Sequence, residues 1–408
     1  MKTLSGVLLL LACSCSSTGP SAAPAIWEPE ARAVGKGRDG QILVWPSESP
    51  SLLFAAPGEK PGAMDLIYRG SHDEAATFEH PIRVNPIPGE VGAHGENAPQ
   101  IRIGPGTELM AAWEGRGEIR FARCVDFGHS FLPAVTVNDD GADAYQSFFA
   151  METGPDGSLV LAWIDFRDSK TEPPGTASIY LARSSDRGAT FEKNVKVAGG
   201  VCPCCRPAIA IGRDGTIHVA WRHVLEQSAR DIVVSSSTDR GRSWSAPVRV
   251  ANDDWRLDGC PHSGPTMAVL PSGLFIAWYT GAKDKASLQV ARSTDGGKSF
   301  GAGVPVESTL NDANHPHLVA VGPEAWILFQ ARTADGSGGW GPLKPALVRC
   351  DADGRPGAPS ILPSLGGSVA YPRLSVGQAG RLYATWTEVG ADGTQVVLCR
   401  GRRAPQPW

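Results

Sequence analysis

The sequence predicts an all-β protein built as a radial array of repeated sheets, and three observations support this fold class. Glycine and proline are frequent, with 48 and 33 copies among 408 residues, which indicates many short elements joined by tight turns. Hydrophobic residues make up 42% of the chain, so a sizeable core can form. Short apolar stretches with a period of two, such as residues 159–163, are typical of strands.

One unit recurs seven times: a turn rich in Gly or Pro, a short apolar strand, and an aromatic residue at the end of that strand. The seven aromatic residues are Trp45, Trp113, Trp163, Trp221, Trp278, Phe329 and Trp386. They follow one another at intervals of 50 to 68 residues. Repeats of this length are typical of arrays in which each unit packs against its neighbours. We therefore expect one domain of seven repeats, although the length alone suggests two or three domains.

A second motif, Ser-x-Asp-x-Gly-x-Ser/Thr-aromatic, follows most of these aromatic residues. Clear copies occupy residues 184–191, 237–244 and 293–300, and weaker copies occupy residues 71–78 and 124–131. The Asp can accept hydrogen bonds from turn amides, the Gly can take a positive φ, and the aromatic residue can pack between sheets. We expect hairpin turns in which the Asp residues are structural.

These stretches resemble the Asp-box, or bacterial neuraminidase repeat (BNR), of the sialidase-like β-propeller superfamily, and the resemblance covers most of the chain. It implies a propeller of four-stranded antiparallel blades around a channel. Seven repeats favour seven blades, with six, as in sialidases proper, as the alternative. Six outermost strands accompany seven second strands, so residues 23–27 are expected to supply the missing edge and close the ring.

The N-terminus has the pattern of a secretory signal. Lys2 precedes the apolar run 7–12, which is too short to span a bilayer. Residues 10–13 (Leu-Leu-Ala-Cys) resemble a bacterial lipobox, in which Cys13 is acylated; an ordinary signal peptide cut near residues 22–25 is the alternative. We expect a signal peptide over residues 1–12, a lipid-anchored tether and potential closing strand over 13–26, and a propeller over 27–408. The protein would be an exported lipoprotein of the bacterial cell envelope.

The net charge of the chain indicates which classes of partner are expected. The formal net charge is −4, so the chain has no global basic field and nucleic acid is not an expected partner. The lipid anchor would be its only membrane contact. We expect a monomer that binds a glycan or another small molecule at the rim of the ring.

Chain direction predicts which face of the ring is functional. Loops that lead into the innermost strands share a face with loops that follow the aromatic residues, and polar residues gather in both sets. Such convergence indicates a pocket. The candidate substrate-binding residues are Glu96, Asn97, Glu114, Tyr145, His223, Tyr279 and Asn314.

The resemblance to sialidases implies three arginines that hold a carboxylate, a Tyr nucleophile assisted by Glu, and an Asp acid/base. Tyr371 is the candidate nucleophile, with Tyr145 as its alternative, and Glu388 is its candidate partner, with Glu114 as the alternative. The candidates are Asp165, Asp168, Arg206, Arg222, Tyr371, Arg373 and Glu388. The early Arg-Ile-Pro motif of sialidases is absent, so none of these residues matches the catalytic set by motif. The first hypothesis is a protein that binds or cleaves glycans and, if it is an enzyme, is a sialidase-like glycoside hydrolase.

A second hypothesis is a metal site in two neighbouring loops. Cys202, Cys204 and Cys205 precede the fourth innermost strand, and Cys260 and His262 precede the fifth. These ligands suit Zn²⁺ or Cu⁺, the only cofactors that the residues suggest. The alternatives are a disulfide, for example between Cys260 and one upstream thiol, or redox-active thiols. A third hypothesis is a surface binding module without catalytic activity.

Overall fold

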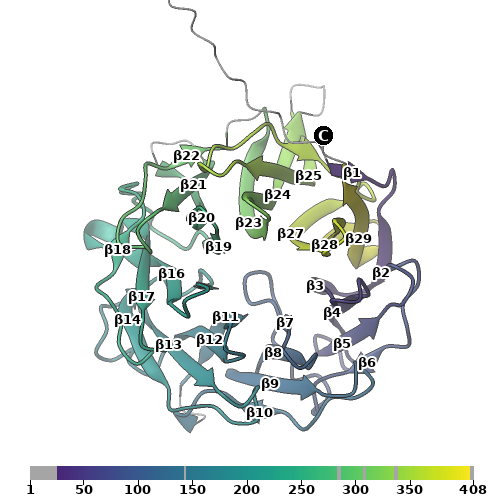
Figure 1. Ribbon diagram of the computed structural model, residues 1–408, viewed down its shortest axis with the longest axis horizontal. Helices are drawn as coiled ribbons and strands as arrows, with labels where there is room; N and C mark the ends of the chain where they lie inside the picture. The colour runs from purple at the N-terminus through teal and green to yellow at the C-terminus, as the bar shows by residue number, and fades with distance from the viewer. Residues whose placement is uncertain (1–24, 142–143, 283–285, 307–308, 335–338, 405–408) are drawn as a thin grey trace, which may run out of the picture.

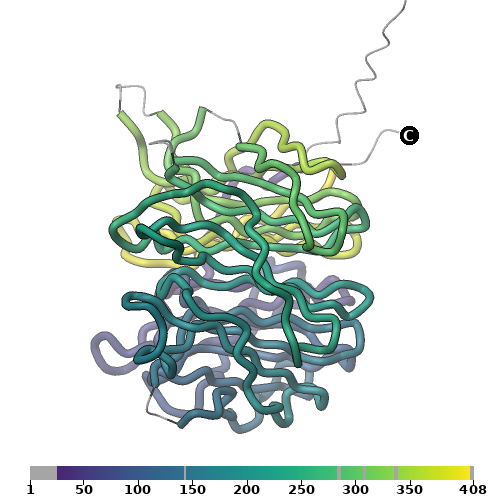
Figure 2. Tube along the Cα trace, turned by 90° about the vertical axis from the view of Figure 1, so that its left-hand side faces the viewer, coloured from purple at the N-terminus to yellow at the C-terminus, as the bar shows by residue number. Residues whose placement is uncertain are grey.

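The computed structural model describes residues 25–141, 144–282, 286–306, 309–334 and 339–404, so the predicted signal peptide and Cys13 lie outside the described residues. Antiparallel sheets stand around a central axis (Figure 1), and a side view shows the N-terminal half of the chain across the ring from the C-terminal half (Figure 2). The all-β prediction is confirmed, and η2 (Glu226–Ser228) is a short 3-10 turn. Within the described residues, no helix has the length and apolarity that a membrane crossing requires.

Among the described residues, five sheets are separate blades, each with its first strand at the centre of the ring. Two are formed by β3 (Arg38–Val44), β4 (Pro50–Pro57), β5 (Met64–Gly70) and β6 (Ile82–Arg83), and by β7 (Gln100–Ile103), β8 (Leu109–Gly115), β9 (Glu118–Cys124) and β10 (Val135–Thr136). Two more are formed by β19 (Thr266–Leu270), β20 (Gly273–Thr280), β21 (Ser287–Ser293) and β22 (Val304–Pro305), and by β23 (Asn311–Val321), β24 (Glu324–Ala334), β25 (Trp340–Cys350) and β26 (Ser360–Ile361). The fifth contains β27 (Ser368–Val376), β28 (Arg381–Gly390), β29 (Gly393–Arg403), β1 (Ala25–Trp27) and β2 (Arg32–Lys36).

The prediction of seven blades, with six as the alternative, is wrong, because the described residues form five blades of this kind and the remaining eight strands form one continuous sheet. It comprises β11 (Gln146–Thr153), β12 (Leu159–Asp165), β13 (Ala177–Ser184), β14 (Val195–Val201), β15 (Ala208–Ile211), β16 (Ile217–Val224), β17 (Arg230–Ser237) and β18 (Val248–Arg249). This sheet carries two of the sequence repeats. The two repeats are joined at the end of β14, where Val201 pairs with His223 of β16. Gly200, with φ +66°, permits this approach, because a Cβ there would lie 2.7 Å from the His223 ring.

The first repeat also differs from its expected arrangement. The repeat pattern predicts a Gly-rich turn at residues 37–40, followed by a second strand that ends at Trp45. Residues 38–40 instead belong to β3, which lines the channel as an innermost strand, and the second strand is β4. The ring closes through the N-terminal segment, because β1 and β2 both pair with β29.

Buried tryptophans at the ends of the second strands fill the spaces between sheets. Trp113, Trp163, Trp221 and Trp386 are fully buried. The Asp-box motifs form the expected turns after β5, β9, β13, β17 and β21. In the copy at residues 184–191, the Asp186 carboxylate accepts hydrogen bonds from the backbone N–H and the hydroxyl of Thr190, at 2.9 and 2.6 Å. These bonds, which offset the effect of burial, lower the pKa of Asp186 to about 2 and support a structural role.

Candidate functional site

The channel of the ring holds a cavity of about 550 Å³, lined by the innermost strands. Its basic lining residues are Arg102, Arg206, Arg373 and His317. Burial, and next the Arg373 guanidinium, lowers the pKa of His317 well below its usual value. The Nδ1 atom of His317 accepts a hydrogen bond from the Leu374 N–H (3.0 Å), so the neutral ring carries its proton on Nε2. The channel therefore presents cationic and neutral donors together.

Glu96 lies beside these arginines on the loop between β6 and β7, which reaches toward the centre of the ring (Figure 1). One carboxylate oxygen accepts a hydrogen bond from His315 Nδ1 (2.9 Å), and the other accepts one from the Gly264 N–H (3.0 Å). Burial opposes ionisation of Glu96. The hydrogen bond from His315 and the charge of Arg206 nevertheless lower its pKa to about 2. Glu96 is thus an ionised carboxylate that connects its own loop to the loop before β19 and to the strand β23.

His315 is oriented by this contact. Because its Nδ1–H donates to Glu96, its Nε2 atom is the free acceptor, and no hydrogen bond to Nε2 is found within the described part of the chain. The Tyr371 ring lies against it, with the two ring centroids 4.3 Å apart. Burial, followed by the charges of Glu96 and Asp39, raises the pKa of Tyr371 to about 12, so its phenol keeps its proton.

Asp39 is the second carboxyl group of the site. It is 1% exposed, and its carboxylate contacts Arg38 Nε (3.0 Å) and the Gly95 N–H (3.3 Å). Burial raises its pKa to about 6, although Arg38 acts against the shift. Asp39 can therefore exchange a proton near neutral pH.

Three of these residues, and Phe148 of β11, have a left-handed backbone conformation. Asp39, Phe148, His315 and Tyr371 have φ between +49° and +57°, each at a register shift in an innermost strand. A left-handed conformation is uncommon for residues other than glycine, and strained positions cluster at functional sites. The bulges turn these residues out of the ordinary strand pattern at the same end of the channel.

Of the sequence candidates, Glu96, Arg206, Tyr371 and Arg373 come together at this centre. Asn97 and Glu114 hold the loop that carries Glu96. The Asn97 side chain accepts a hydrogen bond from the Phe148 N–H (2.7 Å) and donates one to the Gly92 carbonyl (3.1 Å). Glu114 accepts one from the Gly117 N–H (2.6 Å), and burial raises its pKa to about 7.

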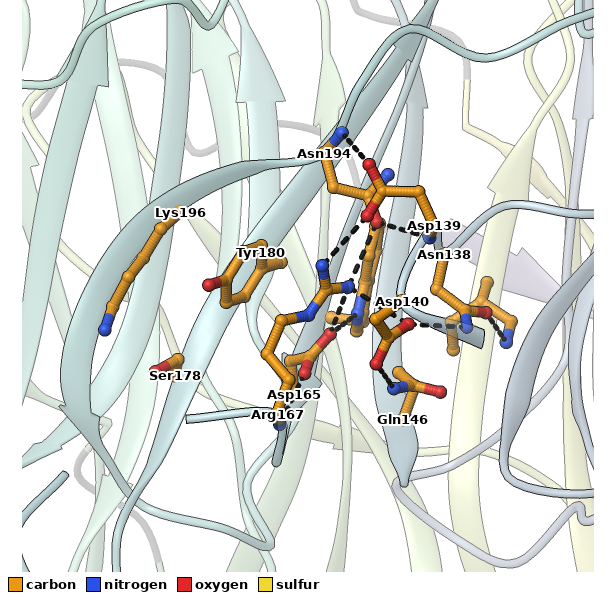
Figure 3. A network of polar contacts seen from close by, with 12 residues as sticks. Asn138, Asp139, Asp140, Gln146, Asp165, Arg167, Ser178, Tyr180, Asn194 and Lys196 are labelled. Carbon is orange, nitrogen blue, oxygen red and sulfur yellow. Dashed lines mark hydrogen bonds and ion pairs between the residues drawn. The ribbon is translucent and has the colours of Figure 1, made fainter. Parts of the chain in front are cut away.

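Asp165 and Asp168 lie in a separate polar network. Asp165 is fully buried and accepts hydrogen bonds from the Trp163 indole (2.8 Å) and from Arg167 (2.8 Å), whose guanidinium also reaches Asp139 (Figure 3). Asp168 pairs with Lys196 (2.8 Å) and accepts hydrogen bonds from Ser178 and Tyr180. These contacts favour a structural role for both carboxylates.

Glu388, His223 and Arg222 are also held by the scaffold. Glu388 accepts hydrogen bonds from the Trp386 indole (2.9 Å) and the Gly367 N–H (2.7 Å). His223 Nδ1 accepts one from the Trp221 indole (3.4 Å). Arg222 is fully buried and donates to the carbonyls of Ser263 and Tyr279.

The last three binding candidates have different surroundings. Tyr145 is 46% exposed and lies 6.0 Å from the Phe166 ring, and Tyr279 stacks edge-on against Trp255. Asn314 adjoins His315, and its buried Oδ1 has no hydrogen-bond partner among the described residues. Asn314 is therefore the one of the three that adjoins the centre.

The cysteines form a cluster beside the same centre. Cys204 and Cys260 form a disulfide that links the loop before β15 to the loop before β19. The Cys202 sulfur lies 3.8 Å from that of Cys204 and 3.7 Å from that of Cys205. The ligand atoms of Cys202, Cys204 and Cys260 lie within 4.8 Å of one another, a grouping that could hold a soft metal if the disulfide were reduced; His262 is not part of it. The contact with Cys205, partly offset by burial and aided by Arg230, lowers the pKa of Cys202 to about 6.

Sequence reasoning missed Asp39, Arg38 and Arg102 as site residues. The pattern predicts a turn at Arg38 and Asp39, because residues 37–40 match the Gly-rich turns of the other repeats. Arg102 lies within a strand and carried no motif.

Comparisons with known proteins agree with this architecture. A family model described as "BNR repeat-like domain" matches residues 147–384, which is more than half of the chain. No curated protein matches the sequence. Among solved structures, the chain is similar to an ulvan lyase bound to a GlcA–Rha3S oligosaccharide (TM-score 0.56, 10% identity, covering 91% of this chain and 95% of that chain).

Two other similar structures are a protein of unknown function from Dyadobacter fermentans and an α-L-arabinanase from Penicillium chrysogenum complexed with arabinobiose. The first has a TM-score of 0.53 and 14% identity, and the alignment covers 94% of this chain and 98% of that chain. The second has a TM-score of 0.50 and 18% identity, and the alignment covers 74% and 92%. At these identities the likeness shows the fold alone, whereas the family match rests on the sequence. The chain belongs to the BNR repeat-like domain family.

Proposed function

We propose that the protein acts on a carboxylated glycan at the channel, with the sugar carboxylate bound by Arg206 and Arg373. The observation that carries this proposal is the unpaired state of the two guanidinium groups. Arg373 is 3% exposed, and its Nη2 has no hydrogen-bond partner in the described part of the chain. Neither arginine forms an ion pair with a described carboxylate, although Glu96 lies near both. Guanidinium groups bind carboxylates in a bidentate manner, so a ligand carboxylate would satisfy them.

The surrounding groups favour proton abstraction from the sugar. Pairing a uronate carboxylate with arginine makes the adjacent C–H more acidic, and His315 Nε2 is a free acceptor held in place by Glu96. The base would take that proton, a double bond would form beside the carboxylate, and the glycosidic C–O bond would break. Tyr371, which keeps its proton, would protonate the departing oxygen. This balances as a β-elimination without any further reactant.

Two of the structurally similar proteins were solved with sugars, one with a glucuronate-containing oligosaccharide and one with arabinobiose, which supports a glycan as the ligand class. The carboxylate-binding arginines favour an acidic glycan over a neutral one. Hydrolysis of the sialidase type would use the same arginines but would give a saturated product. The product therefore distinguishes the two reactions.

The test is incubation of the purified protein with a panel of uronate-containing polysaccharides and sialosides. We expect ultraviolet absorbance from the new conjugated double bond together with new reducing ends. The variant His315→Gln should lower kcat by roughly 100-fold or more, as for loss of a general base. His129→Gln, on an exposed Asp-box turn, is the matched control. Reducing ends without absorbance would indicate hydrolysis, and equal activity of the two variants would contradict the role of His315.

We also propose that the protein is exported and lipid-anchored at Cys13. The Cys204–Cys260 disulfide supports this, because structural disulfides are rare in the cytosol. Labelling of growing cells with a radioactive fatty acid should mark the wild-type protein and not the Cys13→Ser variant. Equal labelling of both would contradict the anchor.

A further inference from the structure

The four cysteines of the rim differ sharply in accessibility. Cys202 and Cys205 are completely buried, Cys204 is 6% exposed, and Cys260 is on the surface. Cys204 is bonded to Cys260, whereas Cys202 and Cys205 are free thiols. The Cys202 sulfur lies between the other two cysteines of its loop, at 3.8 and 3.7 Å. A free sulfur is therefore in contact with a disulfide on one side and with a second thiol on the other.

Cys202 differs from Cys204 and Cys205 in its contact with a cationic side chain. Arg230 Nη1 donates a hydrogen bond to the Cys202 sulfur at 2.9 Å. A guanidinium at this distance stabilises the thiolate, which is the nucleophilic form of cysteine. Cys205 is equally buried, but no hydrogen bond from a cation to its sulfur is found in the described part of the chain. The arrangement resembles an attacking thiol paired with a resolving thiol.

We propose that Cys202 is the nucleophile of an internal thiol–disulfide exchange that moves the disulfide from Cys204–Cys260 to Cys202–Cys205. The Cys202 thiolate attacks the Cys204 sulfur, a Cys202–Cys204 bond forms, and Cys260 leaves as a thiolate and takes up a proton. Cys205 then attacks Cys202 and releases Cys204 as a thiol. One disulfide and two thiols are present before and after, so the exchange needs no oxidant or reductant.

The exchange would open the disulfide that ties two loops of the site to each other. Arg206 directly follows Cys205, and Gly264 lies four residues after Cys260. The two loops touch at these residues: a Cβ on Gly264 would lie 2.1 Å from the Arg206 carbonyl oxygen. The Gly264 N–H also donates to Glu96. The disulfide thus fixes Arg206 relative to Glu96, and its release would loosen the carboxylate site. Only this effect on turnover rests on the proposed function; the exchange itself does not.

The test traps the released thiol. The full-length protein is incubated under native conditions, without reductant, with a maleimide, and its disulfides and labelled cysteines are mapped by peptide mass spectrometry. We expect labelling of Cys260 in molecules that contain the Cys202–Cys205 disulfide. Because Cys202 supplies the attacking sulfur, Cys202→Ser should slow the labelling of Cys260 by roughly tenfold or more. In Cys205→Ser, a Cys202–Cys204 disulfide should accumulate instead.

Two control variants separate the exchange from a general loosening of the fold. Cys124→Ser removes a buried free thiol in the sheet of β7 to β10 and should leave the labelling unchanged. Arg230→Gln should slow it, whereas Arg213→Gln, at an exposed turn, should not. If Cys260 stays bonded to Cys204 in all molecules, or labels equally fast without Cys202, the proposal fails. It also fails if all four cysteines are free and the protein carries stoichiometric zinc or copper. No glycan enters the experiment, so its failure is independent of that of the proposed function.

Discussion

At the residue scale, two acidic residues beside buried tryptophans match a catalytic pattern in the sequence, but in the structure they accept hydrogen bonds from the tryptophan indoles. Asp165 and Glu388 each lie two residues after a tryptophan and accept its indole N–H. An indole N–H that is buried between sheets needs such an acceptor, because an unsatisfied buried donor is costly. In a strand, residues i and i+2 lie on the same face, so this spacing places the acceptor beside the ring. The same pattern in the sequence indicated catalytic carboxylates.

Replacing Glu388 tests this interpretation. Glu388→Ala removes the acceptor of the Trp386 indole and of the Gly367 N–H, and should lower the free energy of unfolding by about 1–3 kcal/mol. Glu388→Gln keeps a carbonyl oxygen at the same position and should lose much less. Urea unfolding of both variants measures the difference. If Glu388 were catalytic, both variants would lose activity, and Glu388→Gln would do so with its stability intact.

At the element scale, the loop between β6 and β7 is the part of the fold that positions the centre. It carries Glu96 to the axis and is anchored at its base by Glu114 and Asn97. Glu114 lies tightly against this loop, since a Cβ on Gly92 would lie 1.6 Å from its carboxylate. The anchor is buried and its pKa is about 7, so its charge changes near neutral pH. The ionisation of the residue that anchors this loop is therefore expected to depend on pH near neutrality.

The raised pKa of Glu114 predicts a pH-dependent stability. Its ordinary pKa is 4.5, so between pH 4.5 and about 7 the native state binds more protons than the unfolded state. The contribution of Glu114 is thus most favourable at low pH and is lost as the pH rises through 7. Glu114→Gln, which stays neutral, should unfold at a higher temperature than wild type at pH 8 and show no such gain near pH 5. Thermal unfolding at both pH values measures this.

The exposed Glu59→Gln is the matched control for Glu114→Gln. It should leave the melting temperature close to that of the wild type at both pH values. A gain of the same size at pH 5 and pH 8 for Glu114→Gln would contradict the predicted titration, because it would show that the effect does not depend on ionisation.

At the scale of the whole molecule, the repeated motifs of the fold could be predicted from the sequence, whereas contacts that occur only once could not. The tryptophans and Asp-boxes recur, so their spacing revealed the propeller and its structural turns. The contact between Glu96 and His315 joins residues 219 positions apart and has no local pattern. The pairing of Val201 with His223, which merges two repeats into one sheet, depends on a local extension of β14. The residues of the first repeat matched the turn pattern, yet ring closure makes them the strand β3.

Closure of the ring by β2 and β29 also occurs only once in the fold, and substitution of one side chain can test it. β2 pairs with β29 and brings Val34 into a core with Ile42, Phe54 and Leu398, between the first and last sheets of the ring. Val34 is 9% exposed, whereas the neighbouring Ala33 is exposed. Val34→Asp would bury an unpaired carboxylate at this junction and should lower the free energy of unfolding by roughly 3 kcal/mol or more. Ala33→Asp places the same charge in solvent and should change it by about 0.5 kcal/mol or less.

Urea unfolding and size-exclusion chromatography of the two variants measure the effect. A ring opened at β2 exposes the edge of β29, and an exposed edge can pair with another chain. We therefore expect Val34→Asp, and not Ala33→Asp, to form higher-order species as well as to unfold at lower urea. If the two variants unfold alike and both remain at the size of the wild type, β2 does not hold the ring closed. The stability of the propeller would then come from the packing of neighbouring sheets alone.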